Sequence, residues 1–205
     1  MPTIMTFGDS NTHGTPPIVT RGLYARFPAG VRWPTVMAAS LGPDWHLVEE
    51  GLPGRTTCFS DPLMGPYMDG PTGLRIALES HGPLDVLTIM LGTNDTKPQN
   101  WKHEAEFVGD YRDLIKSFQE LPSKPKVYVC RPCPVPGKGN FGINEENVLK
   151  IIERLGPLIK ELDCGMIDMH AALLEKAAML PDRVHPNTAG AGEMAKAAAK
   201  AIASK

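Results

Sequence analysis

Short apolar runs alternate with longer stretches in which apolar residues recur every three or four positions, from one end of the chain to the other. The run over residues 86–91, Val-Leu-Thr-Ile-Met-Leu, is apolar at almost every position, which is typical of a strand covered on both faces. Shorter runs of similar character occur at four other places. The expected strands are therefore residues 3–7, 46–49, 86–91, 126–130 and 165–167.

The stretches between these runs favour helices. In residues 104–118 the apolar side chains fall at the spacing of one helix face. Asn144 can cap the helix that follows it, in which Pro157 is expected to produce a kink. An alanine-rich stretch late in the sequence is expected to form a further helix, capped by Asn187 or Thr188. The expected helices are residues 33–40, 72–79, 104–118, 144–162 and 189–203.

Alternating strands and helices predict an α/β protein, in which a parallel sheet carries helices on both faces through right-handed crossovers. A chain of 205 residues suits one substantial core, so we expect residues 1–205 to form a single domain. In such sheets, functional groups gather at the carboxyl ends of the strands. Long segments rich in proline and glycine are expected to line a site or an interface, and these are residues 15–30, 59–71, 96–102 and 134–143.

The charge of the chain favours neither nucleic acid nor an anionic membrane as a partner, because the formal net charge is only −2. The first residues form too short an apolar run for a secretory signal, and they lack its basic start. No stretch approaches the roughly 20 consecutive apolar residues that span a bilayer. The sequence therefore predicts a cytoplasmic protein without a membrane partner.

Cysteine usage does not indicate a disulfide framework, since four cysteines are scattered along the chain. Cys130 and Cys133 do have the spacing of a redox or zinc pair. A redox pair normally begins a helix, whereas this one ends an apolar strand and runs into a proline-rich loop. No second pair follows at the spacing of a zinc site. Two small packing residues are the favoured interpretation, and a thiol protein working through Cys130 and Cys133 stays open as an alternative.

Candidate catalytic groups occur in four segments, residues 8–12, 51–56, 92–95 and 182–185. Ser10 directly follows the first expected strand, so its hydroxyl can face the carboxyl edge of the sheet. By itself, Gly-Asp-Ser is a common turn tripeptide in which the serine would cap a helix. Asp182 and His185 are three residues apart on an expected turn, which lets the carboxylate bind one imidazole nitrogen while the other faces outward. Such an imidazole could act as the base for Ser10.

Two further segments carry hydrogen-bond donors. Gly54 lies in a tight turn after the second strand, where the missing side chain lets the backbone N–H approach a ligand. Asn94 adds an amide donor at the end of the third strand. A pair of backbone N–H groups with one amide side chain suits the stabilisation of a developing oxyanion. Asp9 and Asp95 flank these positions and are expected to bind loop backbone.

Together and in this order, the four segments resemble the SGNH hydrolases, also called the GDSL esterase/lipase family, and they bracket almost the whole chain. The resemblance implies a catalytic triad of Ser10, Asp182 and His185. It also implies an oxyanion hole formed by the backbone N–H groups of Ser10 and Gly54 and the side chain of Asn94. The implied fold is a three-layer α/β/α flavodoxin-like sandwich with a five-stranded parallel sheet. The α/β-hydrolases are disfavoured, because their Gly-x-Ser-x-Gly elbow is absent.

The second segment, Val-Glu-Glu-Gly-Leu-Pro-Gly-Arg-Thr-Thr, looks like the arylesterase and acyltransferase/perhydrolase branch of that family. Members of this branch act on short acyl groups, often acetyl, and several form oligomers. Their first segment usually reads Gly-Asp-Ser-Leu-Thr-Trp-Gly, whereas here Asn11 and His13 replace the Leu and the Trp. We expect Asn11, His13 and Arg55 to line the substrate pocket, although Arg55 could instead bind Glu49 or Glu50.

The leading hypothesis is a serine esterase that hydrolyses short-chain esters, above all acetyl esters, of aryl or carbohydrate alcohols through an acyl-enzyme. Acyltransferase or perhydrolase side activity is implied by the same branch. The expected partners are a small-molecule ester and further copies of the chain in a homo-oligomer. His–carboxylate spacing for a metal is absent, and the triad needs no cofactor. Two alternatives on the same fold stay open, a thioesterase or lysophospholipase and a non-catalytic carbohydrate-binding protein.

Overall fold

The computed structural model describes residues 1–18 and 25–204. Within these ranges the chain forms one sheet of five strands, and every pair of neighbouring strands is parallel. The strand order is β2-β1-β3-β4-β5, which is the flavodoxin-like order. All five expected strands are confirmed, with ends within two residues of the prediction. Their bounds are β1 (Thr3–Gly8), β2 (His46–Gly51), β3 (Val86–Met90), β4 (Lys126–Arg131) and β5 (Gly165–Asp168).

The five expected helices are also confirmed, as α2 (Trp33–Leu41), α3 (Gly70–His81), α4 (Phe107–Gln119), α5 (Glu145–Glu161) and α7 (Thr188–Ala203). Asn144 and Asn187 cap α5 and α7. The helix α5 runs without interruption through Pro157, where the sequence predicts a kink. Several short helical turns were not expected, because one turn leaves little periodicity in a sequence. They are α1 (Ser10–His13), α6 (Met169–Leu173), η1 (Asn94–Thr96), η2 (Trp101–His103), η3 (Asn140–Gly142) and η4 (Ala177–Met179).

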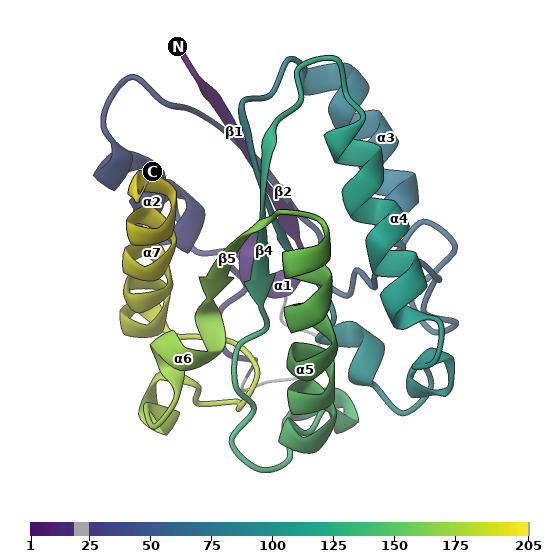
Figure 1. The fold of residues 1–205 in the computed structure, drawn as a ribbon. Helices are drawn as coiled ribbons and strands as arrows, with labels where there is room; N and C mark the ends of the chain where they lie inside the picture. Colours follow the sequence, from purple (N-terminus) through teal and green to yellow (C-terminus); the bar gives the residue numbers. More distant parts are fainter. Residues whose placement is uncertain (19–24, 205) are drawn as a thin grey trace.

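The sheet is the middle layer of three (Figure 1). The helices α3, α4 and α5 cover one face, and α2 and α7 cover the other. Neighbouring side chains of the central strands enter different cores: Phe7 of β1 packs with the first group of helices, and Ile4 packs with the second. Because both faces are covered, the central strand β3 is apolar at almost every position, as the sequence showed. None of the described helices has the length and apolar character needed to span a bilayer.

The register of the sheet brings the candidate segments to one edge. Gly8 at the end of β1 is level with Gly51 of β2 and with Met90 of β3. The chain segments that follow these three residues therefore emerge side by side at the carboxyl edge. Several of the predicted long connections lie at this edge too, although residues 19–24 of the connection over 15–30 lie outside the described residues.

Candidate active site

Ser10 is held at the carboxyl edge by the turn from β1 into α1. Asp9 caps this short helix, because its Oδ1 accepts the N–H of Asn11 at 2.9 Å. Ser10 is thus the first residue of α1, and the capping role that its tripeptide suggested belongs to Asp9. Gly51 lets α1 lie close against β2, since a Cβ at that position would come within 2.1 Å of the backbone nitrogen of His13.

His185 lies between Ser10 and Asp182 in a continuous chain of hydrogen bonds. Its Nε2 is 3.0 Å from Ser10 Oγ, and its Nδ1 is 2.6 Å from Asp182 Oδ2. The side chains of His185 and Asp182 are only 3% and 2% exposed. This arrangement fixes the imidazole so that one nitrogen is bound to a carboxylate and the other is available to the serine hydroxyl.

The Asp182 carboxylate is oriented by the backbone around it. Its Oδ1 accepts the N–H groups of Val184 and His185, and its Oδ2 accepts the N–H of Ile18. Arg183 takes a left-handed conformation, with φ of 68°, and so closes the turn that brings Asp182 and His185 together. Burial alone raises the pKa of Asp182, but the hydrogen bonds and charge of His185 outweigh it and lower the pKa to about 2. Asp182 therefore remains ionised at neutral pH.

The three residues predicted to supply oxyanion donors, Ser10, Gly54 and Asn94, line the same cleft. The N–H of Ser10 starts α1 and so has no acceptor within the helix. Gly54 adopts a left-handed φ of 90°, and a Cβ there would lie 2.7 Å from Met64. Asn94 Nδ2 donates to the carbonyl of Arg55 at 3.0 Å, whereas its distance to Asp9 Oδ2 is 3.4 Å, which is long for a hydrogen bond. One amide N–H of Asn94 is therefore weakly held and available to an oxyanion.

A cleft of about 520 Å³ opens over these groups. Ser10, Gly54, Asn94 and His185 all line it, so the structure brings the predicted nucleophile, base and oxyanion donors to one surface. The rest of the lining is mostly apolar and comprises Thr15, Ile18, Pro53, Met64, Lys97, Phe141, Ile143 and Val184.

A comparison with models of known protein families identifies the family to which the chain belongs. Residues 6–192 match the model of the GDSL-like lipase/acylhydrolase family. The chain belongs to this family. The match covers all four of the segments that carry the predicted site.

Individual relatives of this GDSL-like chain agree with that result. An acetylxylan esterase from Xylanibacter ruminicola is 30% identical over 203 residues, which is 90% of this chain. The chain spans only 41% of the length of that relative. A solved carbohydrate acetylesterase from Sinorhizobium meliloti is 29% identical, with a TM-score of 0.85 and 99% of both chains covered. The inhibitor-bound aryl esterase of M. smegmatis is 28% identical, with a TM-score of 0.87 and 98% of both chains covered.

The three expected pocket residues of this GDSL-like protein do not line the cleft. Asn11 is buried and faces a separate hollow that Trp33 and Met194 also line. His13 lies against Thr15, with Nδ1 3.0 Å from its hydroxyl. The physical reason is the helical turn of α1, which rotates successive side chains by about 100° and so directs its residues to different sides.

The side chain of Arg55 also lies outside the cleft lining. It is buried, and its Nη1 donates to the backbone carbonyls of Gly8 and Glu50. Its guanidinium carbon lies 4.1 Å from the centroid of the Phe7 ring. Arg55 thus ties the main chains of β1 and β2, and Glu49 pairs instead with Arg32.

Asp9 and Asp95 bind loop backbone, as expected. Asp95 accepts the N–H of Thr57 at 3.0 Å, and Asp9 accepts that of Asn11. Both carboxyls are fully enclosed, and burial raises the pKa of each to about 6 despite these hydrogen bonds. Their hydrogen bonds hold the loops after β1 and β2 in place.

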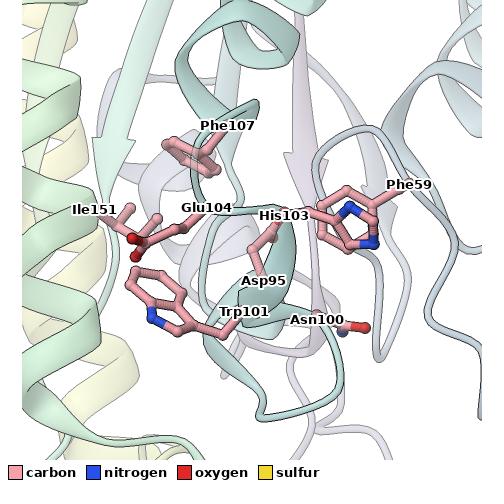
Figure 2. Close-up of a pocket in the computed structure, with 8 residues that line it drawn as sticks. All are labelled: Phe59, Asp95, Asn100, Trp101, His103, Glu104, Phe107 and Ile151. Carbon is pink, nitrogen blue, oxygen red and sulfur yellow. The ribbon is translucent and has the colours of Figure 1, made fainter.

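Asp95 also lies beside a second, narrower hollow (Figure 2). Figure 2 shows Trp101 and Glu104 toward Ile151 of α5, with Phe59 and His103 on the opposite side. The rings of Phe59 and His103 are 4.3 Å apart between centroids. None of the triad residues lines this hollow, which belongs to the packing between the loop after β2, η2 and α5.

The thiol and metal interpretations gain no support from the described residues. Cys130 and Cys133 are free and buried, and burial raises the pKa of both thiols far above the usual range. Within residues 1–18 and 25–204, no group of three or more His, Cys, Asp or Glu side chains could hold a metal ion.

The cleft contains residues that sequence reasoning did not identify, namely Met64, Lys97 and Phe141. Each lies in or beside one of the long proline- and glycine-rich segments that were expected to line a site. The segments could be predicted, but the residues that point inward could not, because loops lack a side-chain period.

Proposed function

We propose that this GDSL-family protein is a serine esterase that hydrolyses short-chain esters, chiefly acetyl esters, of aryl or carbohydrate alcohols. The observation that carries the proposal is the chain of hydrogen bonds from Ser10 through His185 to Asp182 at the foot of the cleft. The proposed specificity for acetyl and aryl esters is supported by the relatives, which are an acetylxylan esterase, a carbohydrate acetylesterase and an aryl esterase.

In the first half-reaction, His185 Nε2 takes the proton of Ser10 Oγ as the oxygen attacks the ester carbonyl carbon. The tetrahedral oxyanion is stabilised by the N–H groups of Ser10 and Gly54 and by the Asn94 amide. His185, held by Asp182, then gives its proton to the leaving alcohol oxygen, and the acyl group remains on Ser10. Asp182 stays ionised and stabilises the imidazolium.

In the second half-reaction, water attacks the acyl-enzyme, with His185 again accepting the proton and returning it to Ser10 Oγ. The products are the free enzyme and a carboxylic acid, which ionises to a carboxylate by releasing a proton to water. An alcohol or a peroxide in place of water would give acyl transfer or perhydrolysis, and the apolar lining of the cleft supports such side activity by limiting water.

The test is hydrolysis of 4-nitrophenyl acetate by the wild type and by Ser10→Ala. We expect the variant to lose at least about 10³-fold in kcat. Full activity in Ser10→Ala would contradict the assignment. A series of 4-nitrophenyl esters from acetate to octanoate addresses the alternative functions. A steep loss beyond butanoate is expected, and a maximum at long chains would favour a lysophospholipase or thioesterase.

Further features of the proposal rest on the sequence. We propose that residues 1–205 act as one domain, and that copies of the chain form a homo-oligomer around the cleft mouth. Large apolar side chains exposed in the loops there support the second point, namely Leu63, Met64, Tyr67 and Phe141. A monomeric mass in light scattering would contradict it. The cytoplasmic location stays a prediction that cell fractionation can test.

A further inference from the structure

Lys97 is a polar residue in the wall of the cleft that the esterase mechanism does not use. Its side chain is only 6% exposed, yet it lines the cleft together with Ser10 and Asn94. A lysine so far from bulk water is uncommon, because burying an ammonium without a partner is costly. A buried ammonium in this position therefore needs a counter-ion.

The partner is Asp61, which lies in the loop after β2. Its Oδ2 is 3.1 Å from Lys97 Nζ, and its side chain is fully buried. The same carboxylate accepts hydrogen bonds from Gln99, Asn100 and the N–H of Leu63. Asp61 does not line the cleft. Asp61 therefore neutralises Lys97 from outside the cleft, whereas Lys97 itself is part of the cleft lining.

The ammonium retains donors for a ligand. Lys97 Nζ carries three N–H groups, and among the described residues it makes one hydrogen bond, to Asp61. The ring of Phe141 lies 5.8 Å from Nζ, which is a cation–π contact and not a hydrogen bond. Two N–H groups are thus available to an acceptor that enters the cleft.

The backbone fixes Lys97 relative to the oxyanion donors. Lys97 ends η1, where its N–H donates to the carbonyl of Asn94 at 3.3 Å. The Asn94 amide and the Lys97 ammonium therefore come from the same turn after β3. Since the ester carbonyl oxygen is assigned to Asn94, Lys97 meets a different part of the substrate. The surrounding side chains are apolar, so this ammonium is a distinctive polar feature of the wall.

Resting on the proposed esterase function, we propose that Lys97 is a specificity-determining residue that donates a hydrogen bond to a neutral substrate oxygen outside the ester group. A sugar hydroxyl or an ether oxygen has the required chemistry. The Asp61–Lys97 pair has no net charge, so it favours such an oxygen over a carboxylate or phosphate. A substrate with a methylene at that position would leave the ammonium without an acceptor and is disfavoured.

The experiment uses two pairs of esters, and the members of each pair differ by one oxygen. In the first pair, trans-2-hydroxycyclohexyl acetate carries an additional oxygen in the alcohol part, and cyclohexyl acetate lacks it. In the second pair, 4-nitrophenyl methoxyacetate carries an oxygen in the acyl part where 4-nitrophenyl butanoate has a methylene. The value of kcat/KM is measured for the wild type, for Asp61→Asn, and for Asp61→Asn/Lys97→Met, which removes both charges and leaves neither buried alone. Within each pair, the ratio of kcat/KM values is independent of the fraction of folded enzyme.

We expect the ratio of oxygenated to apolar ester to be at least about tenfold lower in the double variant than in the wild type, for one pair. The pair that responds identifies the part of the substrate that Lys97 contacts. Unchanged ratios in both pairs, or an equal loss for all four esters, would overturn the proposal and leave Lys97 a structural residue. If the double variant does not fold, Asp61→Asn/Lys97→Leu gives the same comparison with another side chain that lacks a donor. A wild-type enzyme inactive on all four esters would instead contradict the esterase function itself.

Discussion

Of the imidazole–carboxylate pairs among the described residues, two are closer than the rest and nearly equal in length. His185 Nδ1 lies 2.6 Å from Asp182 Oδ2, and His170 Nε2 lies 2.7 Å from Glu145 Oε1. In each pair the carboxylate also accepts a backbone N–H. By the length of the imidazole–carboxylate contact alone, the two pairs are equivalent.

They differ in what the second imidazole nitrogen meets. His185 Nε2 faces the hydroxyl of Ser10 at 3.0 Å, under a cleft and beside the donors of the oxyanion hole. His170 is 12% exposed, and among the described residues its second nitrogen makes no hydrogen bond. The difference teaches that a carboxylate can orient any histidine, whereas catalysis requires a nucleophile and oxyanion donors on the other side of the ring.

The largest difference between the two pairs is expected when each histidine is replaced in turn. His185→Gln removes the base that activates Ser10, so we expect kcat for 4-nitrophenyl acetate to fall by about 10⁴-fold or more. His170→Gln removes the matched imidazole that has no nucleophile, and it should leave kcat within about twofold. Comparable losses in the two variants, measured in the same ester assay, would contradict the distinction.

Replacing each carboxylate by its amide tests whether Asp182 orients the imidazole of His185. Asp182→Asn keeps the shape of the turn but favours the wrong imidazole tautomer, so we expect kcat to fall by about 10⁴-fold at neutral pH. Glu145→Gln is the matched control, and its kcat should match the wild type. Steady-state kinetics with both variants measures the difference. An active Asp182→Asn enzyme would mean that the carboxylate does not hold the catalytic tautomer.

The proposed oxyanion donors also distinguish the two pairs, because they line the cleft together with His185, whereas His170 does not line it. Asn94→Ala removes one donor while the hydrogen bonds of the triad remain. We expect kcat to fall by about 10²- to 10³-fold with a small change in KM, since the donor acts mainly in the transition state. A change confined to KM would assign Asn94 to substrate binding instead.

The smallest expected effect concerns stability against pH. The pKa of Asp182 is about 2 in the folded protein, below its ordinary value of 3.8, so its ionised form stabilises the fold. This contribution, about 2 kcal/mol, is present above pH 4 and is lost as the pH falls toward 2. Urea unfolding should therefore show Asp182→Asn less stable than the wild type at pH 6, with the gap narrowing below pH 4. A gap independent of pH would show that the pKa of Asp182 is not depressed.

The sequence predicted the strands and the main helices, because a sheet covered on both faces leaves unbroken apolar runs. The positions of Ser10 and His185 beside element ends also followed from the periodicity, whereas their proposed catalytic roles rested on the resemblance of the four segments to the SGNH hydrolases. Asn11 and Arg55 were misplaced, since their directions depend on the one-turn helix α1 and on the packing of Arg55 over Phe7. Lys97 escaped notice because its partner, Asp61, is 36 residues away in a loop.

The most direct test of the central claim is the mass of the protein after reaction with a fluorophosphonate, followed by peptide mapping. The phosphonyl group reacts with a serine only when a neighbouring base has activated it. We predict one adduct per chain on the peptide that contains Ser10, formed equally in the wild type and in His170→Gln, and absent in Ser10→Ala. An adduct on another residue, or undiminished labelling of Ser10→Ala, would contradict the assignment of Ser10 as the nucleophile.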